Sequence, residues 1–283
     1  MSFIELENLN FTDEKINKVK TLLPAVRSSK ANVLITGPTG TGKSYLAKHI
    51  LGAYEYITVD AADMVEDFDF AAFFSKVSAQ AFLFENIEKL SANLQRSLFE
   101  ALESRADHDK IRILSTSRVS LKSLVQKSQF REDLYYRLTV LNLELPSLGE
   151  RVTDIETVSK YLVGVFGIIH QKADVDLSPE ALEKMKMWNW PGNIRELENV
   201  LERAVIIARG SLIAASEISI EASEPKKESA TFAGMTLSEV EQKLILQTLQ
   251  MTEQNRTRAA ELLGISIRTL RNKINEYRQA GVV

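Results

Sequence analysis

Eight residues near the start of the chain have the types and spacing of a phosphate-binding loop. They run Gly37-Pro38-Thr39-Gly40-Thr41-Gly42-Lys43-Ser44 and match the pattern G-x-x-x-x-G-K-[ST] completely. Glycines let backbone N–H groups approach phosphates, and the helix expected after Gly42 directs its positive end at them. Lys43 is expected to reach the β- and γ-phosphates, and the Ser44 hydroxyl to ligate Mg²⁺. The sequence therefore predicts a site for ATP or ADP with Mg²⁺, the alternative being a glycine-rich turn followed by Lys-Ser by chance.

Hydrolysis at such a site needs a carboxylate at the end of a neighbouring strand to hold Mg²⁺ and usually a second acidic group to orient water. The apolar run Ala81–Phe84 ends in Glu85-Asn86. Glu85 can serve the metal directly or through water, or it is a solvated strand end. Asn86 cannot act as a general base, because an amide has no useful basicity near neutral pH. At these two catalytic positions the sequence therefore predicts slow or absent hydrolysis.

Strand-like and helix-like patterns alternate along the first half of the chain. The short apolar runs are rich in β-branched or aromatic residues, which is typical of buried parallel strands. These runs are Ala31–Thr36, Tyr56–Asp60, Ala81–Phe84 and Ile111–Ser115. Helical patterns lie between them at Lys43–Leu51, Phe70–Val77 and Leu90–Ser104. The alternation predicts an α/β P-loop core over residues 1–145, with the phosphate-binding loop directly after its first strand.

Beyond Leu145 the strand patterns stop and helical patterns continue. The predicted helices are Asp154–Phe166, Pro179–Met187 and Ile194–Ala208. Residues 146–220 are therefore expected to form a helical lid subdomain. Residues 221–235 are polar and without periodicity, which is typical of a linker. A separate all-helical domain is expected over residues 236–283.

The C-terminal region has the pattern of a helix-turn-helix. Thr236–Gln250 predicts an amphipathic helix, a shorter helix then leads to a turn at Gly264, and Ile267–Tyr277 predicts the last helix. The residues expected on or near one apolar face of the first helix are Leu237, Val240, Leu244, Leu246 and Leu249. The expected packing seam of the motif is Ala260, Leu263, Ile265, Leu270 and Ile274.

The distribution of charge indicates double-stranded DNA as the partner of this domain. Residues 255–283 contain six cations and two acids, whereas the whole chain has a net charge of −3, so the remainder is acidic. The residues expected to reach base edges are Arg268, Thr269, Arg271 and Asn272, and those expected to contact phosphates are Arg258 and Lys273. Domains of this kind bind as dimers to half-sites about one helical turn apart. The alternative is a helical bundle with a solvated basic face.

The composition excludes several other classes of protein. With 45% hydrophobic and 26% charged residues the chain is an ordinary globular one, and no apolar run approaches the roughly 20 residues of a membrane helix. The N-terminus lacks the basic start and apolar stretch of a signal peptide. Without cysteine there are no disulfides or thiolate metal sites, and three scattered histidines argue against a histidine-rich metal site. We expect a cytoplasmic protein without a membrane partner.

Several segments together resemble the AAA+ domain of bacterial enhancer-binding transcription activators, the NtrC-like regulators of sigma-54 promoters. The segments that carry the resemblance are Val33–Gly37, Phe130–Leu138, Leu145–Arg151 and Trp190–Asn199, and the C-terminal region resembles a Fis-type DNA-binding domain. The resemblance covers nearly the whole chain. It implies that Arg131 and Arg137 reach the γ-phosphate in the adjacent subunit of a ring, and that Arg195 contacts nucleotide within its own subunit. Surface or ion-pair roles are the alternative for these arginines.

The chain departs from the family pattern at three places. Glu85-Asn86 stands where the family has Asp-Glu, and Ser117-Arg118 aligns with the Thr-Asn of the family's sensor. The family carries a loop, Gly-Ala-Phe-Thr-Gly-Ala, between the second and third strands, and this loop contacts the sigma factor. Here 20 residues, 61–80, separate those strands, and none is glycine. We therefore expect that the loop is missing and that hydrolysis is not coupled to opening of a sigma-54 polymerase complex.

Three functions follow from these residues and stay open. The first, which we favour, is a DNA-binding transcription regulator that uses ATP or ADP as a structural or regulatory ligand and forms a dimer or ring. The second is an active AAA+ ATPase that activates sigma-54 RNA polymerase through another loop. The third is an interaction protein that pairs with a full-length paralogue and alters its ring through Arg131 and Arg137.

The source of control and the regulated pathway are less defined. Only Met1–Lys30 precedes the first strand, which is too short for a receiver domain. We therefore expect control by a partner, by nucleotide or by expression level. The stretch Gly264–Lys273 is similar to flagellar-gene regulators of the family, so flagellar genes are an expected target.

Overall fold

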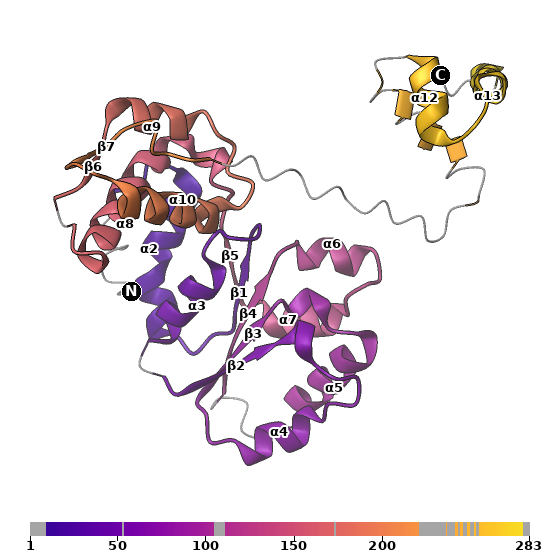
Figure 1. The fold of residues 1–283 in the computed structure, drawn as a ribbon. Coiled ribbons are helices and arrows are strands. Elements are labelled where there is room, and N and C mark those ends of the chain that lie inside the picture. The colour runs from indigo at the N-terminus through magenta and orange to yellow at the C-terminus, as the bar shows by residue number, and fades with distance from the viewer. Residues whose placement is uncertain are drawn as a thin grey trace. The chain divides into compact units, whose positions relative to one another are not determined.

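The computed structural model describes residues 10–52, 54–104, 111–172 and 174–220, and in the C-terminal part residues 236, 241–242, 244–245, 248–249, 252 and 255–279. The chain divides into two compact units, Met1–Ile220 and Glu221–Val283 (Figure 1). The expected linker, 221–235, lies outside the described residues. Across the described part of the chain, no helix combines the length and apolar character needed to cross a bilayer.

A five-stranded parallel sheet forms the centre of the larger unit, in the order β2-β3-β4-β1-β5. Its strands are β1 (Val33–Thr36), β2 (Tyr56–Asp60), β3 (Ala81–Glu85), β4 (Arg112–Ser117) and β5 (Leu141–Glu144). The four strands predicted from the sequence are confirmed, with ends that differ by at most two residues. β5 was not among them, because only Leu143 of its four residues is buried and it lacks an apolar run. Since all five strands run the same way, the residues that follow them gather at one edge of the sheet.

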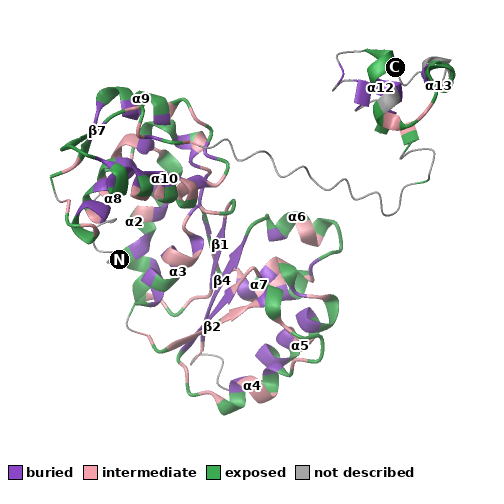
Figure 2. Ribbon diagram, in the orientation of Figure 1, coloured by how far each residue is buried: buried purple, intermediate pink, exposed green. Residues whose placement is uncertain are grey.

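Side chains along the central strands alternate between two apolar layers, as expected of pleated strands. Leu34 belongs to one layer and its neighbours Val33 and Ile35 to the other, and Leu83 is separated from Phe82 and Phe84 in the same way. The layer of Val33 includes α2 (Glu14–Ser28) and α3 (Lys43–Leu51). The opposite layer includes α4 (Phe70–Lys76), α5 (Ala92–Glu103), α6 (Leu121–Gln126) and α7 (Glu132–Leu138). Helices thus cover both faces of the sheet (Figure 2), which confirms the predicted α/β P-loop fold.

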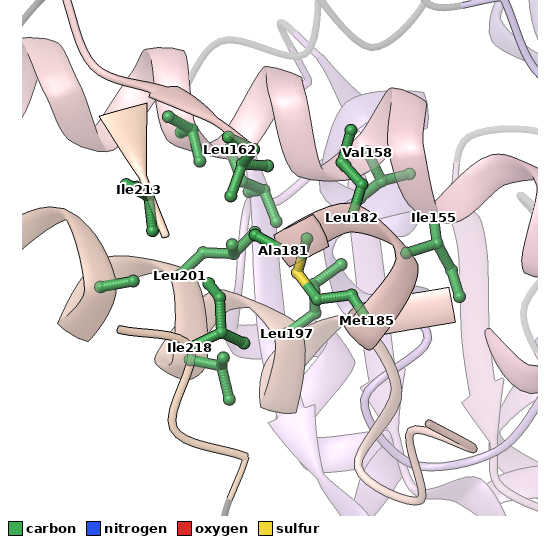
Figure 3. Close-up of a cluster of buried hydrophobic side chains, with 14 of the residues drawn as sticks. Ile155, Val158, Leu162, Ala181, Leu182, Met185, Leu197, Leu201, Ile213 and Ile218 are labelled. Carbon is green, nitrogen blue, oxygen red and sulfur yellow. The ribbon is translucent and has the colours of Figure 1, made fainter. Parts of the chain in front are cut away.

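The segment after β5 forms the helical part of the same unit. Its helices are the 3₁₀ helix η4 (Gly149–Asp154) and the α-helices α8 (Ile155–Ile169), α9 (Pro179–Lys186) and α10 (Asn193–Ile207). The three α-helices confirm the prediction and enclose an apolar core that includes Leu162, Met185 and Leu201 (Figure 3). Two strands of two residues, β6 (Asp176–Leu177) and β7 (Leu212–Ile213), pair in parallel. The expectation that strands end at Leu145 is therefore wrong, because pairs this short leave no pattern in the sequence.

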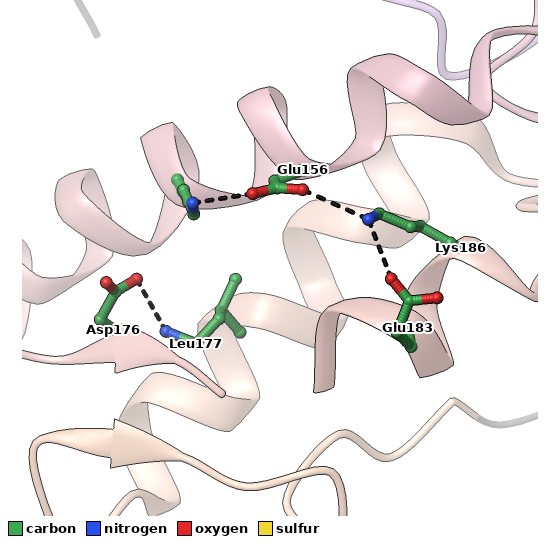
Figure 4. Close-up of polar contacts among 6 residues, drawn as sticks. Glu156, Asp176, Leu177, Glu183 and Lys186 are labelled. Atoms are coloured by element: carbon green, nitrogen blue, oxygen red, sulfur yellow. Dashed lines mark hydrogen bonds and ion pairs between the residues drawn. The ribbon is translucent and has the colours of Figure 1, made fainter. Parts of the chain in front are cut away.

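Ion pairs join the surfaces of α8 and α9. Glu156 on α8 accepts a hydrogen bond from Lys160 at 2.8 Å and pairs with Lys186 at 3.3 Å, and Lys186 also pairs with Glu183 (Figure 4). These partners hold the pKa of Glu156 below its ordinary value and the pKa of Lys186 above it. Because the side chains are exposed to water, the pairs add little to stability, and the apolar core of Figure 3 holds these helices together.

The smaller unit contains α12 (Arg256–Leu263) and α13 (Ile267–Gln279). Gly264 has a φ of 66°, a left-handed conformation that glycine adopts without strain, and it makes the predicted tight turn between them. Ser266 caps α13, since its Oγ accepts a hydrogen bond from the backbone N–H of Thr269 at 3.0 Å. The helix-turn-helix prediction is confirmed.

The helix predicted before this motif lies only partly within the described residues, and residues 241–242, 244–245 and 248–249 of it are helical. Leu237, Val240 and Leu246 lie outside the described residues. Leu249 packs with Ala260, Leu270 and Ile274, as predicted. Leu244 is 47% exposed, so its place on the packed face was wrong, because the buried face runs through Ile245.

Candidate functional site

The phosphate-binding loop connects the centre of the sheet to a helix. β1 ends at Thr36, and α3 begins at Lys43 with Gly42 as its N-cap. Gly40 and Gly42 have φ values of 81° and 94°, which residues with a Cβ rarely adopt. The first N–H groups of α3 have no partner within the helix, so together with the loop backbone they favour an anion.

Lys43 is the best-placed cation for such an anion. Its Nζ donates to the backbone oxygens of Gly37 and Pro38, both at 2.7 Å. The residue is 9% exposed, and its pKa is lowered to about 8, mainly by burial; the charge of Glu88 opposes this shift, and the charges of Arg118 and Arg195 contribute to it. Two neutral carbonyl groups compensate a buried ammonium poorly, so an anionic ligand is the stronger partner for this group.

A cavity of about 630 Å³ lies over the loop, within the size range of small-molecule sites. The loop and the start of α3 contribute Thr39, Gly40, Thr41, Gly42, Lys43 and Ser44 to its lining. The other polar or charged lining residues are Lys20, Tyr45, Lys48, Asp60, Glu85, Asn86, Thr116, Arg118, Arg151, Tyr161, Arg195 and Glu198. Its apolar lining includes Phe11, Ile16, Val19 and Leu23 from the segment of α2, and Val158 and Leu162 from α8. A cavity lined by cationic and by apolar side chains suits the phosphates and the base of a nucleotide.

Asn86 joins two charged side chains at the edge of the sheet. Its Nδ2 donates to Asp60 Oδ1 at 2.9 Å and Oδ2 at 3.1 Å, and its Oδ1 accepts a hydrogen bond from Arg118 Nε at 2.9 Å. Asn86 has a φ of 53°, and its backbone N–H donates to Thr116 Oγ1. The amide therefore links the end of β2 to the end of β4. Ser117, the other candidate sensor residue, is buried, and its Oγ donates to the backbone oxygen of Val119.

The two candidate metal ligands, Ser44 and Glu85, both line the cavity. Oxygen ligands of this kind suit Mg²⁺, which usually takes one or two protein oxygens together with phosphate oxygens and water. Among the residues that the structure describes, no cluster of three or more His, Cys, Asp or Glu side chains forms a complete protein metal site. The donor set thus fits a metal that arrives with a phosphate ligand.

The lid helix α10 contributes the remaining charged groups. Arg195 lines the cavity, and its backbone N–H donates to the oxygen of Gly40 at 3.3 Å. Glu198, one turn later, also lines the cavity, and burial raises its pKa although the charge of Arg195 opposes this. Of the predicted nucleotide residues, Thr39 to Ser44 and Arg195 are therefore brought together around one cavity, whereas Gly37 and Pro38 are not part of its lining.

Arg131 is the N-cap residue of α7 and Arg137 lies in its last turn, and neither is part of the cavity lining. Arg131 makes a two-point contact with Asp133, at 3.1 and 2.6 Å, which raises the pKa of Arg131 and lowers that of Asp133. Arg137 pairs with Glu103 at 3.6 Å and donates to the backbone oxygen of Leu102. Neither arginine lines the cavity of its own subunit.

The candidate DNA-binding residues lie on the helix-turn-helix. Arg268, Thr269, Arg271 and Asn272 are exposed at the start of α13, and Arg258 is exposed on α12. Lys273 pairs with Glu241 at 2.9 Å and is partly buried. The start of α13 thus presents a polar and basic surface.

Three residues of this site were missed in the sequence. Asp60 is the last residue of a predicted strand. Because the ends of parallel strands meet at one edge of the sheet, the sequence could have indicated that Asp60 lies near Glu85 and Asn86. Glu88 follows Asn86 in the 3₁₀ helix η2 (Ile87–Lys89), its charge raises the pKa of Lys43, and within the described residues neither carboxylate oxygen has a hydrogen-bond partner. Asn193 binds the loop from the lid, and no local pattern predicts such a contact.

Comparison with known families covers most of the chain. The family models that match are a Sigma-54 interaction domain at residues 12–148, an AAA+ ATPase lid domain at residues 149–234, and a Bacterial regulatory protein, Fis family, at residues 236–277. Among curated relatives, the transcriptional regulatory protein FlbD of Caulobacter vibrioides is 34% identical over 95% of this chain and 70% of its own length. The regulatory protein AtoC of Escherichia coli is 32% identical over 88% of this chain and 63% of its own length.

Solved structures share the fold. NtrX from Brucella abortus, crystallised in complex with ATP, has a TM-score of 0.62 at 23% identity, over 95% of this chain and 68% of that chain. The RuvB branch migration motor of Thermotoga maritima has a TM-score of 0.54 at 18% identity, over 96% of this chain and 88% of that chain. The chain therefore spans roughly two thirds of the length of its transcriptional relatives.

Proposed function

The chain belongs to the family of sigma-54-dependent transcriptional regulators, and from that premise we propose that it is a DNA-binding member that holds ATP or ADP with slow or no hydrolysis. The observation that carries this proposal is Asn86. It stands where hydrolysis needs a carboxylate, and both ends of its amide are engaged by Asp60 and Arg118. Nucleotide then acts mainly as a structural or regulatory ligand of the protein.

Binding follows from the residues around the cavity. The loop 37–42 and the first turn of α3 supply N–H donors for phosphates, and Lys43 exchanges its two carbonyl partners for phosphate oxygens. Arg195 supplies a second positive charge from the lid. Ser44 and Glu85 would hold Mg²⁺, which neutralises charge on the phosphates. NtrX of Brucella abortus, crystallised with ATP and with ADP, supports the same ligand for this fold.

Slow hydrolysis follows from the missing base. A positioned general base contributes roughly 10²- to 10⁴-fold to rate, and the amide of Asn86 accepts no proton near neutral pH. Its present contacts also hold Arg118 beside Asn86, at 2.9 Å, rather than at an incoming phosphate. ATP can therefore bind to the charged residues that an ATPase uses, but no general base activates the water beside it.

We do not expect the chain to make productive contact with sigma-54. The 20 residues between β2 and β3 contain no glycine, and they hold the 3₁₀ helix η1 (Ala61–Asp63) and α4. Phe70 and Phe74 of α4 are at most 1% exposed and pack with Phe82 and Phe84 of β3. A segment anchored in the core in this way replaces the surface loop with which the family contacts the sigma factor.

The remaining domains complete the regulator. We assign residues 1–145 to the nucleotide-binding core, 146–220 to the lid, 221–235 to a linker and 236–283 to the DNA-binding domain. Exposed Arg268, Thr269, Arg271 and Asn272 would read bases from the start of α13. Flagellar genes are the proposed target, supported only by the likeness of Gly264–Lys273 to regulators of such genes.

A second candidate function is favoured by α7. Arg131 and Arg137 lie outside their own subunit's cavity and are held by Asp133 and Glu103. If they are released toward a neighbouring subunit, they serve the nucleotide of that subunit. The chain would then enter the ring of a complete family member and change its activity, and co-purification with such a relative tests this function.

The proposed function is tested by transcription in vitro. Purified protein is added with ATP to sigma-54 RNA polymerase on a promoter with an upstream site, and binding of the protein to that DNA is measured in parallel. The proposal predicts DNA binding without open-complex formation. Open complexes that require ATP and this protein alone would contradict it and support an active ATPase of the usual kind.

A further inference from the structure

Asn193 is the first residue of α10 and has an unusual backbone conformation. Its φ is 54°, in the left-handed region, which asparagine tolerates better than most residues with a Cβ. Its backbone N–H donates to the oxygen of Trp190 at 2.8 Å, and the residue is only 2% exposed. A buried polar side chain in a strained conformation indicates that its contacts hold it there.

The side chain of Asn193 connects two distant segments. Its Nδ2 donates to the backbone oxygen of Thr39 in the phosphate-binding loop at 2.8 Å. Its Oδ1 accepts a hydrogen bond from the backbone N–H of Leu148, where the lid begins, at 2.7 Å. One partner is an acceptor and the other a donor, so only this orientation of the amide satisfies both. The residue therefore bridges the loop, the start of the lid and α10.

The backbone of the phosphate-binding loop also contacts the start of α10 directly. A Cβ on Gly40 would overlap the carbonyl oxygen of Gly192, the residue before α10. The oxygen of Gly40 also accepts a hydrogen bond from the N–H of Arg195. The backbone oxygens of Thr39 and Gly40 thus both accept hydrogen bonds from α10.

We propose that Asn193 is a positioning residue that couples nucleotide occupancy of the phosphate-binding loop to the placement of the lid. The inference rests on the proposed nucleotide site and adds the route by which that site acts on the rest of the chain. It requires no hydrolysis, because a bound phosphate displaces the loop through contacts alone. By the reciprocity of linkage, the lid placement that Asn193 favours also sets the affinity of the loop for nucleotide.

The chain carries its own probe of this coupling. Its two tryptophans, Trp188 and Trp190, immediately precede Asn193. Trp190 is buried, with Nε1 bonded to the oxygen of Met185 at 2.8 Å. Trp188 Nε1 donates to Glu196, whose other carboxylate oxygen accepts from the N–H of Gly192. Intrinsic tryptophan fluorescence therefore reports on the segment that Asn193 anchors and on little else.

The test compares ADP binding, measured by calorimetry, with the tryptophan response of the same full-length protein. The main variant is Asn193→Gly, because glycine adopts a positive φ without strain and removes only the side-chain bridge. Asn193→Asp keeps the acceptor for Leu148 and loses the donor to Thr39. The matched control is Asn32→Gly, which removes a similar bridge between Arg137 and Ile113 inside the core.

We expect a fluorescence change on ADP binding in the wild type and in Asn32→Gly. In Asn193→Gly and Asn193→Asp we expect binding weakened by about tenfold and most of the fluorescence change lost at saturation. A full response in saturated Asn193→Gly or Asn193→Asp would overturn the inference, as would a wild type that binds ADP without any response. If the wild type binds no nucleotide, the proposed function itself fails, and the calorimetry shows this separately.

Discussion

The buried ammonium of Lys43 makes nucleotide affinity depend on pH in a defined direction. Without a ligand its pKa is lowered to about 8 by burial, from an ordinary value of 10.5. Phosphate oxygens favour the charged form, so binding raises the pKa again. The affinity for nucleotide is therefore highest below about pH 8. It falls as the pH rises from there to the pKa of the bound state, and it does not fall further above that pKa.

The size of the effect follows from the two pKa values. If phosphate restores the ordinary value, the association constant for ADP falls by about tenfold between pH 7 and pH 9. Binding at pH 9 should also take up close to one proton, so the measured enthalpy depends on the ionisation enthalpy of the buffer. Titration calorimetry at pH 7, 8 and 9, each in two buffers, measures both quantities.

Lys43→Gln is the control, because it removes the titrating group and keeps most of the side-chain volume. Its affinity for ADP should be weak and nearly constant from pH 7 to pH 9. A wild-type affinity that is equally constant, with no uptake of protons, would refute the reasoning about Lys43.

Four further substitutions test separate parts of the molecule. Arg137→Ala should leave the affinity of an isolated subunit for ADP within about twofold of the wild type, because this arginine lies outside the cavity of its own subunit and pairs with Glu103. A loss of affinity of about tenfold or more in calorimetry would contradict this position of Arg137. Arg271→Ala should cost about 1–3 kcal/mol of specific DNA binding and relax the sequence preference. Arg258→Ala should weaken binding to all sequences and lower by about one the slope of log binding constant against log salt concentration. Fluorescence anisotropy distinguishes the two, and identical effects would contradict the assignment of Arg271 to bases and Arg258 to phosphates. Gly40→Ala should destabilise the larger unit by more than about 1 kcal/mol, since its φ is 81° and the Cβ would overlap Gly192; an unchanged melting temperature would argue against the close contact.

The elements with strong local signals were predictable. Buried runs such as Ala81–Phe84 and periodic helices such as Ile194–Ala208 carry their pattern within a few residues. The helix α2 was not predicted, because Pro24 lies inside it, although Asp13 caps it by accepting from the N–H of Ile16 and its buried residues recur at helical spacing. β5 was missed for the related reason that Leu143 is its only buried residue.

The site was predictable wherever a motif is continuous in sequence. The loop 37–44 needs only its own spacing, and its helix begins where expected. The bridge from Asp60 through Asn86 to Arg118 joins three strand ends that are 26 and 32 residues apart. The contact of Asn193 with Thr39 spans 154 residues. Contacts of this range depend on how the sheet and lid pack, and a single sequence carries no direct record of them.

Turnover of ATP by the wild type and by Asn86→Glu tests the central claim most directly. The measurement is phosphate release at saturating ATP, with and without DNA, alongside calorimetric binding under the same conditions. The account predicts binding by both proteins, wild-type turnover below about 10⁻² s⁻¹, and a rise of at least about tenfold in Asn86→Glu, since a general base is worth roughly 10²- to 10⁴-fold. Wild-type turnover above about 1 s⁻¹ that DNA stimulates would contradict it, because Asn86 would then not limit the chemistry.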